Sequence, residues 1–417
     1  MSLLRPVVIL VLCFSLALSL TGCYSRSEIE DIGFIVSWGL EKGEKENYKV
    51  IVQIAAPSKV SSKSGGGGGE EPPYWLGQAE GETFFAALRE LAKRSSRQLH
   101  FSHAEALIIQ EEVAREGLAP IIDILTRNSD MRPRMSIFIT SEKIKNILEV
   151  TPGLENLPST YITKLERRIM KHEETVHFEV KDFYTQMQPG NEALIPRIST
   201  WQEPNQTEGQ NQGGSNANLL PASTGSTAPK DQGENKELIL EGAAVFRDTK
   251  MIDWLNSTET YYLKWLRGEV VDGPMIISLN GCSFSLRVRE TNRFIKIIPN
   301  VKSPGSSRIE LKIIAETDLV EVEKPAVAIN NDLIAQIEQA ASENLERELN
   351  RMLSKVKYDL ETDVLGFGEL VRRKIPHSIW ERYQEPWNSE FQNLIIQVST
   401  NIQLRRLGMT IQSPFIY

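Results

Sequence analysis

One polar stretch, residues 201–237, constrains the organisation of this chain more than any other segment. It is rich in Gln, Asn, Gly, Ser and Pro and contains few large apolar side chains. Such a segment cannot bury enough apolar surface to offset the conformational entropy lost on folding. We therefore predict a disordered linker here, between folded regions at 23–200 and 238–417; the alternative is a disordered loop. The 417 residues, 41% of them hydrophobic, can bury a large core and suggest two or three domains.

The N-terminus has the pattern of a lipoprotein leader. A basic start at Arg5 precedes an apolar run over residues 7–20. A membrane-spanning helix needs roughly 20 apolar residues, so the shorter run predicts a cleaved signal peptide over 1–22. The run ends in Leu20-Thr21-Gly22-Cys23, and a cysteine directly after Leu-x-Gly resembles the lipobox of bacterial lipoproteins. We predict lipidation of the Cys23 sulfur; the alternative is an ordinary secreted protein that begins with a cysteine.

Lipidation of Cys23 would determine where the folded part lies. Two acyl chains, each contributing ~0.8 kcal/mol per buried CH₂, hold a protein stably at a membrane surface without spanning the membrane. No later stretch reaches about 18 uninterrupted apolar residues, so we expect the rest of the chain to fold outside the membrane. The net charge of −8 disfavours a nucleic-acid partner, because phosphate binding requires a basic face.

The cysteines predict no disulfide within one mature chain. Cys13 leaves with the leader and Cys23 is expected to carry the lipid, so only Cys282 remains of the three. Cys282 lies in an apolar, strand-like stretch. This setting favours a small buried hydrophobic residue over a nucleophile.

The region 23–200 alternates strands and helices. Residues 32–40 and 48–56 are apolar, β-branched runs around a polar segment and predict a β-hairpin. Helices are expected at 84–92, 113–125, 144–148, 161–170 and 178–187, and strands within 99–110, 135–140 and 194–198. This alternation is typical of mixed α/β packing, in which helices cover a sheet.

Residues 100–105 contain the densest group of chemically active side chains. His100, His103 and Glu105 are metal-ligand types, and His-x-Glu matches one part of a zinc deaminase motif. The other part, Pro-Cys-x-x-Cys, is absent, and the sequence has neither His-Glu-x-x-His nor Gly-x-Ser-x-Gly. We interpret His100, Ser102 and His103 as structural residues, with ligand binding as the alternative. The sequence predicts no catalytic, cofactor-binding or metal-binding residue.

Two other features are interpreted as surface. The glycine run 65–69 could cradle a phosphate only before Gly-Lys-Ser or Gly-Lys-Thr at a helix start, and Glu70-Glu71-Pro72-Pro73 follows instead. We therefore predict a flexible loop. His172 and His177 stand among charged residues and are interpreted as part of a solvated face.

The region 238–417 predicts an antiparallel sheet with a long helix on one face, and hence an α+β fold. Asn331 or Asp332 could cap a helix over 333–356, whose apolar residues recur every three or four positions. Residues 394–404 alternate with a period of two, as in a strand with one buried face. Further strands are expected at 238–246, 275–289, 293–299 and 308–322, and a short helix at 259–265. Packing between the helical part and the last strand is expected to use Phe367, Trp380, Trp387 and Phe391.

Four short motifs together resemble the Ger(x)C family of spore germination lipoproteins. They are, in order, Leu20-Thr21-Gly22-Cys23, Leu99-His100-Phe101-Ser102-His103, Gly242-Ala243-Ala244-Val245-Phe246 and Gly366-Phe367-Gly368-Glu369 followed by Trp380, Trp387 and Phe391. The resemblance spans nearly the whole mature chain. The family commonly has a Trp-Asp pair after the lipidated cysteine, where this sequence has Tyr24-Ser25.

The resemblance implies the C subunit of a nutrient germinant receptor in an endospore-forming Gram-positive bacterium. Such a subunit is lipid-anchored on the outer face of the spore inner membrane, beside integral membrane subunits of types A and B. Family members are similar in being elongated, three-domain α+β proteins without a known enzymatic activity or cofactor. Two domains would lie within 23–200 and one from 238 onward, and Cys23 alone receives a chemical role.

Two other functions are weighed against this one. A solute-binding lipoprotein of a small-molecule transporter would need a cleft between two domains with convergent polar groups. A lipid-anchored enzyme is disfavoured, because the sequence lacks the signature of a nucleophile, a metal or an acid–base pair.

Overall fold

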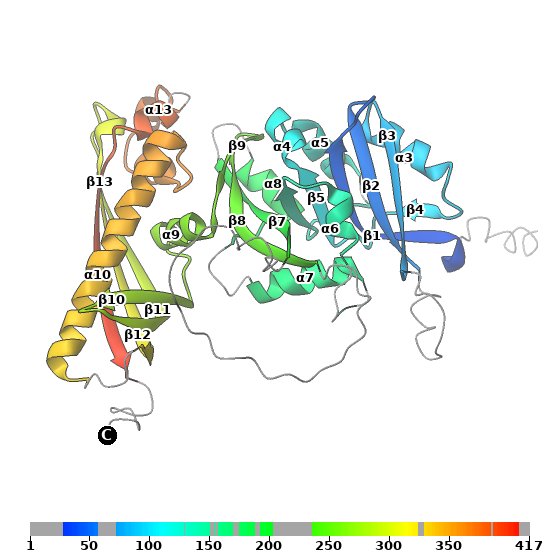
Figure 1. Cartoon of the computed structure of the whole chain (residues 1–417). Coiled ribbons are helices and arrows are strands. Elements are labelled where there is room, and N and C mark those ends of the chain that lie inside the picture. The colour runs from blue at the N-terminus through cyan, green and yellow to red at the C-terminus, as the bar shows by residue number, and fades with distance from the viewer. Residues whose placement is uncertain are drawn as a thin grey trace, which may run out of the picture.

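The computed structural model describes residues 28–56, 72–128, 130–150, 155, 157–169, 175–187, 192–202, 236–323, 329–384 and 387–407. In these residues the chain forms two β-sheets, each packed against helices, which confirms the predicted multi-domain α+β fold. Figure 1 shows the two sheets on either side of a short helix. The predicted leader, Cys23, His172, the glycine run 65–69 and residues 203–235 lie outside the described residues.

The first sheet contains nine strands of the described chain. These are β1 (Ile32–Lys42), β2 (Tyr48–Ala55), β3 (Tyr74–Gly81), β4 (Gln98–His100), β5 (Ala106–Gln110), β6 (Ser136–Thr140), β7 (Glu192–Trp201), β8 (Glu237–Arg247) and β9 (Lys250–Leu255). Their order is β3-β2-β1-β5-β6-β7-β8-β9, with β4 paired to β1. β1 and β2 form the predicted hairpin, whereas β1, β5 and β6 are parallel and therefore begin at the same edge of the sheet.

Helices cover both faces of this sheet. They are α3 (Phe84–Ala92), α4 (Glu111–Glu116), α5 (Ala119–Arg127), α6 (Ile144–Leu148), α7 (Pro158–Ile169) and α8 (Val180–Gln186), and a 3-10 turn, η1 (Ile29–Asp31), precedes β1. Alternate residues of β5 point into two cores: Leu107 packs in the core with α3, α4, α5 and α8, and Ile108 in the core with α6 and α7. The helix expected at 113–125 is divided, because Gly117 ends α4 with a φ of +128°.

The polar stretch 201–237 joins two neighbouring strands of this one sheet. β7 and β8 pair antiparallel, from Glu192 opposite Arg247 to Trp201 opposite Glu237. The first sheet therefore contains residues from both of the regions that the sequence separates at this stretch. The change from the first sheet to the second comes later in the chain, after β9.

The second sheet has the order β10 (Gly273–Leu279), β11 (Cys282–Ile298), β12 (Arg308–Val322) and β13 (Ile395–Arg406). The single strand expected at 275–289 is wrong, because Asn280 and Gly281, with φ of 53° and 72°, form a tight turn between β10 and β11. A two-residue turn with both φ positive is the type that matches strand twist. β10, β11 and β12 are antiparallel, and β13 is parallel to β12.

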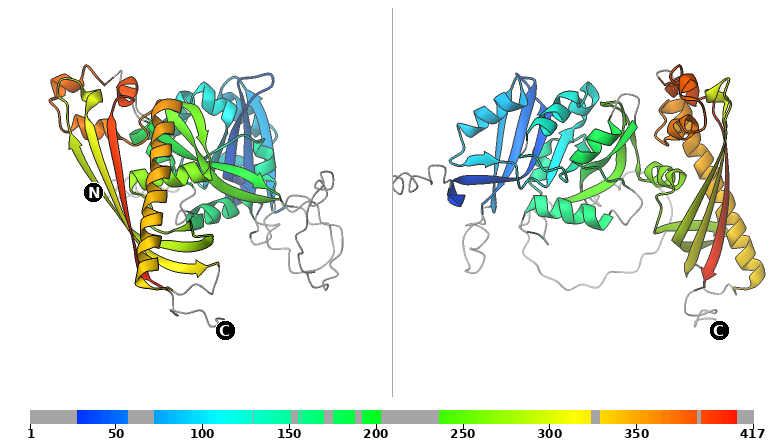
Figure 2. Two further views of the ribbon diagram at one scale, coloured as in Figure 1. Left: turned by 60° about the vertical axis from the view of Figure 1, so that its left-hand side comes forward. Right: turned by 180° about the vertical axis from the view of Figure 1, so that it is seen from behind.

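The long helix α10 (Asn331–Ser354) crosses one face of the second sheet (Figure 2). Its N-cap is Asn330, whose side chain accepts from the Leu333 N–H at 2.8 Å, so the expected caps at Asn331 or Asp332 are wrong by one or two positions. The predicted stripe is buried at Ile337, Ala341, Leu345, Leu349 and Met352. No helix within the described residues is both long enough and apolar enough to cross a membrane.

Three short helices follow α10 and cover one end of the second sheet. A π-helical turn (Lys355–Asp359) ends α10, and α11 (Phe367–Arg372), α12 (His377–Trp380) and α13 (Trp387–Phe391) follow. Phe367, Trp380, Trp387 and Phe391 are all buried here, and the rings of Trp380 and Trp387 lie 5.0 Å apart. This confirms that the aromatic set has a packing role.

The helix between the two sheets is α9 (Ser257–Arg267) (Figure 1). It begins with a reciprocal capping box: the Asn256 side chain accepts from the Glu259 N–H at 2.8 Å, and the Glu259 side chain accepts from the Asn256 N–H at 3.0 Å. Its residues Leu263, Trp265 and Leu266 are buried in one core, which also includes residues of β8, β9, β11 and α10. The helix therefore packs in a core shared by both sheets.

We expect Trp265→Ala to lower the free energy of unfolding by about 3–5 kcal/mol, because a large cavity would open in the shared core. Trp265 is 1% exposed, whereas Val271, shortly after α9, is 72% exposed and serves as the control. Val271→Ala should change stability by no more than about 0.5 kcal/mol. Urea unfolding followed by circular dichroism measures both, and equal small effects would contradict the importance of this core.

Candidate functional site

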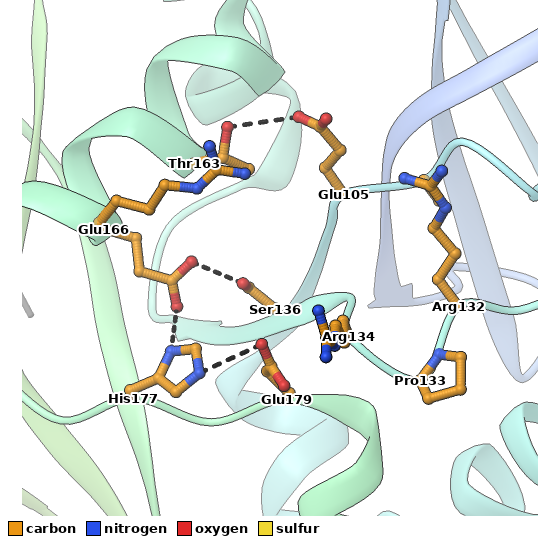
Figure 3. A pocket seen from close by; sticks show the side chains of 11 residues that line it. Glu105, Arg132, Pro133, Arg134, Ser136, Thr163, Glu166, His177 and Glu179 are labelled. Carbon is orange, nitrogen blue, oxygen red and sulfur yellow. Dashed lines mark hydrogen bonds and ion pairs between the residues drawn. The ribbon is translucent and has the colours of Figure 1, made fainter.

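A pocket of about 620 Å³ opens beside α7 at the edge where β5 and β6 begin (Figure 3). This volume lies within the range of small-molecule sites. We call it the α7 pocket; it is lined by Ala104, Glu105, Arg132, Pro133, Arg134, Ser136, Thr163, Glu166, Arg167, His177 and Glu179. Four parts of the chain supply these residues: the segment leading into β5, the segment leading into β6, one face of α7, and the extended segment before α8.

A hydrogen-bonded network forms one wall of the α7 pocket. The buried Glu166 carboxylate accepts from Ser136 Oγ at 2.5 Å and lies 2.7 Å from His177 Nδ1. His177 Nε2 lies 3.4 Å from Glu179 on its other side. The hydrogen bond to Glu166 raises the pKa of His177, with smaller contributions from the charges of Glu166, Glu179 and Asp182. His177 therefore keeps a proton to a higher pH than an ordinary histidine.

Three arginines from two parts of the chain line the α7 pocket. Arg132 and Arg134 flank Pro133 just before β6, and Arg167 lies on α7. All three are exposed. Among the residues that the structure describes, no hydrogen bond or ion pair engages any of the three guanidinium groups. The pocket thus combines a fixed, internally paired wall with unpaired cations.

The histidine motif does not form one cluster. Glu105 lines the α7 pocket, where it accepts from Thr163 Oγ1 at 3.3 Å, whereas the His103 ring packs against Phe34 with centroids 4.6 Å apart. Phe101, between the two histidines, is buried against Trp38. In the described part of the chain, no group of three His, Cys, Asp or Glu side chains could hold a metal ion.

The predicted environment of His177 is wrong. The residue was expected on a solvated face, yet its side chain is only 28% exposed and lies between two carboxylates. Its partner Glu166 is on α7, one turn before the end of that helix, and the flanking charges gave no sign of this pairing. The residues of the pocket come from separate segments, so only their spatial arrangement identifies the site.

A second pocket, about 370 Å³, lies where the start of β7 meets α11, α12 and α13. Its centre is Asp363, which is 3% exposed. The Asp363 carboxylate accepts from the N–H groups of Phe367 and Gly368, at 3.0 and 2.5 Å, and from Trp387 Nε1 at 2.9 Å. It therefore satisfies two free N–H groups at the start of α11 and fixes the indole of α13.

The arrangement around Asp363 explains the two glycines of the Gly366-Phe367-Gly368 motif. Gly366 has a φ of +70°, in the left-handed region that favours glycine. A Cβ on Gly368 would lie 2.3 Å from Trp387 Nε1, so only glycine lets the indole approach Asp363. The motif is thus a packing device around a buried carboxylate.

Glu192, at the start of β7, shares the second pocket with Asp363. Burial, and then the negative charge of Asp363, raise the pKa of Glu192 to about 8. Burial also raises the pKa of Asp363 to about 6, although its hydrogen bonds act in the opposite direction. One oxygen of Glu192 is buried without a hydrogen-bond partner among the described residues. Two carboxyl groups, one from each half of the chain, therefore meet in a poorly solvated junction.

Of the two cysteines with predicted roles, the structure describes only Cys282. Cys282, at the start of β11, is a free thiol and 5% exposed, which confirms it as a small buried residue. Cys23, the one predicted modification site, lies outside the described residues.

Two family models match most of the chain. Residues 25–200 match the spore germination protein N-terminal domain, and residues 241–408 match the model described as spore germination B3/GerAC like, C-terminal. The interval between the two matches corresponds to the polar stretch and the start of β8.

Curated relatives match along their full length. Spore germination protein KC of Bacillus subtilis (strain 168) is 26% identical over 412 residues, with 97% of each chain covered. Spore germination protein B3 of the same organism is 18% identical, covering 95% of this chain and 96% of the relative. The crystal structure of the GerBC protein matches with a TM-score of 0.53 and 12% identity, covering 90% of this chain and 99% of that one. The two proteins thus share a fold.

We expect Gly368→Ala to displace Trp387 from Asp363 and to lower the free energy of unfolding by about 1.5–3 kcal/mol, the usual contribution of a hydrogen bond to a charged group. Gly366→Ala is the matched control, since nothing lies within 4 Å of its Cβ position. It should cost about 1 kcal/mol through backbone strain and leave the Trp387 indole N–H resonance unshifted. An unshifted resonance in Gly368→Ala would contradict the steric argument.

We expect the folded protein to lose stability as pH rises from about 5 to about 8, in part through Glu192. A carboxyl group whose pKa is raised on folding, here from 4.5 to about 8, favours the folded state below pH 4.5, and this contribution is lost as pH rises through 8. Glu192→Gln should reduce the loss by up to about 5 kcal/mol, since the pKa rises from 4.5 to about 8 and one pKa unit corresponds to about 1.4 kcal/mol.

The control for this measurement is Glu381→Gln, because the Glu381 side chain is 62% exposed. Urea unfolding at a series of pH values gives the slope for each variant. The control should keep the wild-type slope, and a Glu192→Gln slope equal to it would refute the role of the junction carboxyl.

Proposed function

Because the chain belongs to the Ger(x)C family of spore germination proteins, we propose that it is the lipid-anchored C subunit of a nutrient germinant receptor. The observation that carries the proposal is the order of the two family matches, at 25–200 and 241–408, together with relatives that align over 97% of their length. In this role the subunit acts with membrane-embedded A and B subunits. Its part in germination is non-catalytic.

The proposed anchor is the lipidated sulfur of Cys23 on the outer face of the spore inner membrane. The described chain begins at residue 28 and passes through η1 into β1, the third strand from one edge of the first sheet. A short leading segment therefore joins the anchor to a strand held on both sides by neighbours. Such a tether holds the folded part next to partners in the membrane.

The second candidate, a solute-binding lipoprotein, calls for a cleft between two domains. The second pocket lies at such a junction, but Asp363 at its centre already accepts three hydrogen bonds from the protein. This arrangement favours the receptor subunit. Calorimetry with amino acids and sugars distinguishes the two, because a solute-binding lipoprotein must bind its transported solute in that cleft.

We expect Cys23→Ala to release the protein from the membrane fraction of dormant spores and to slow germination in response to nutrients, because the acyl chains supply the attachment. Ser25→Ala, two residues away, is the control and should behave like the wild type. Immunoblots of spore fractions and the fall in optical density after nutrient addition measure the two effects. Wild-type germination by a soluble Cys23→Ala protein would refute the proposal.

A further inference from the structure

We propose that the α7 pocket binds a small organic anion, whose phosphate or carboxylate groups pair with Arg132, Arg134 and Arg167. The inference is independent of the proposed receptor role. It rests on the shape of the pocket and on the distribution of unpaired charge within it.

The carboxylates of the pocket already have partners within the protein. Glu166 accepts from Ser136 and is paired with His177, and Glu105 accepts from Thr163. Glu179 is paired with Lys181 and caps α8. His177 and Lys181 offset the charges of Glu166 and Glu179, and Glu105 is hydrogen-bonded to the neutral Thr163 hydroxyl. The three arginines facing the same space have no hydrogen-bond or ion-pair partner within the described chain. The pocket therefore carries more positive than negative charge and suits an anionic ligand.

The arginines reach the pocket from two different elements. Arg132 and Arg134 belong to the segment before β6 (Figure 3), and Arg167 belongs to α7. Ser136 and Glu166, which also line the pocket, are each 6% exposed and form its fixed wall. A guanidinium group donates two parallel hydrogen bonds to a phosphate or carboxylate, which suits a compact ligand with two such groups.

His177 makes the wall compatible with an anion. Its proton lies between Glu166 and Glu179, with Asp182 of α8 also nearby, so the imidazolium offsets the charge that these carboxylates would present to the ligand. Because the pKa of His177 is raised, mainly by its hydrogen bond to Glu166, the ring keeps this proton to a higher pH than an ordinary histidine. Anion affinity should fall as pH rises and the imidazole becomes neutral.

The ligand could be a free solute or a lipid headgroup. β1, β5 and β6 are parallel, so the chain enters the first sheet at the same edge as the pocket. An anchor on the leading segment would bring that edge towards the membrane. Both sources present the same chemistry to the arginines, and soluble probes of each kind separate them.

The test is isothermal titration of the full-length protein in a neutral detergent with inorganic phosphate, succinate and glycerophosphoglycerol, the deacylated headgroup of phosphatidylglycerol. Arg167→Gln should weaken binding of the best probe about tenfold or more, as the loss of charge-assisted hydrogen bonds implies. Arg168→Gln is the matched control: it is the next residue of α7, equally exposed, and does not line the pocket. The variant's affinity should stay within about twofold of the wild type, because the Arg168 side chain does not line the pocket and its exposed charge is screened by salt.

Tightest binding of glycerophosphoglycerol identifies a headgroup, and tightest binding of phosphate or succinate identifies a solute. Succinate, whose carboxylates are ionised throughout the neutral range, should bind more weakly as pH rises, and His177→Gln should flatten this dependence. Absence of saturable binding by all three probes overturns the proposal. An equal loss of affinity in Arg167→Gln and Arg168→Gln also overturns it, because binding would then depend only on the general surface charge.

Discussion

The burial of α9 in a core shared by both sheets is the interaction on which the rest of the structure depends. Leu263, Trp265 and Leu266 pack with residues of β8 and β9 on one side and of β11 and α10 on the other. Polar contacts beside this core also connect the two parts of the chain. Arg247, at the end of β8, donates to Thr362 Oγ1 at 2.8 Å, and Lys355 pairs with Glu259 at 2.6 Å. The second pocket, with its buried carboxyl pair, exists because this core brings the start of β7 against α11.

Periodicity predicted the local elements of the fold better than their pairing. The apolar stripe of α10 and the alternation of β13 were predictable because each reflects contact with one extended surface. The Asn280-Gly281 pair is a typical hairpin-turn sequence, but it lies within a run that otherwise has the pattern of one continuous strand. The pairing of β7 with β8 across a long polar stretch, and the parallel β13, depend on contacts between distant residues, which a periodic pattern does not contain.

The candidate sites were even harder to predict from the sequence, because their residues also come from distant segments. The motif at residues 99–103 was visible in the sequence, yet its buried member, Phe101, has a packing role against Trp38. His177 and Glu166 form the paired wall of the α7 pocket, but each stands among charged residues that resemble an ordinary surface. Asp363 is similar: its role depends on the close approach of Trp387, which Gly368 permits. The spacing of residues along the chain predicts helix faces and strands. These sites bring together residues that are distant in the sequence, so spacing alone does not predict them.

Family membership identifies a spore germination protein with two sheets on a common core. Our proposal adds a tether at Cys23 and partners in the membrane. The most direct test is affinity purification of the tagged protein from membranes of dormant spores, followed by mass spectrometry. The account predicts that receptor subunits of the A and B types copurify with it in comparable amounts. Recovery of a transporter ATPase instead, or of no membrane partner, would contradict it.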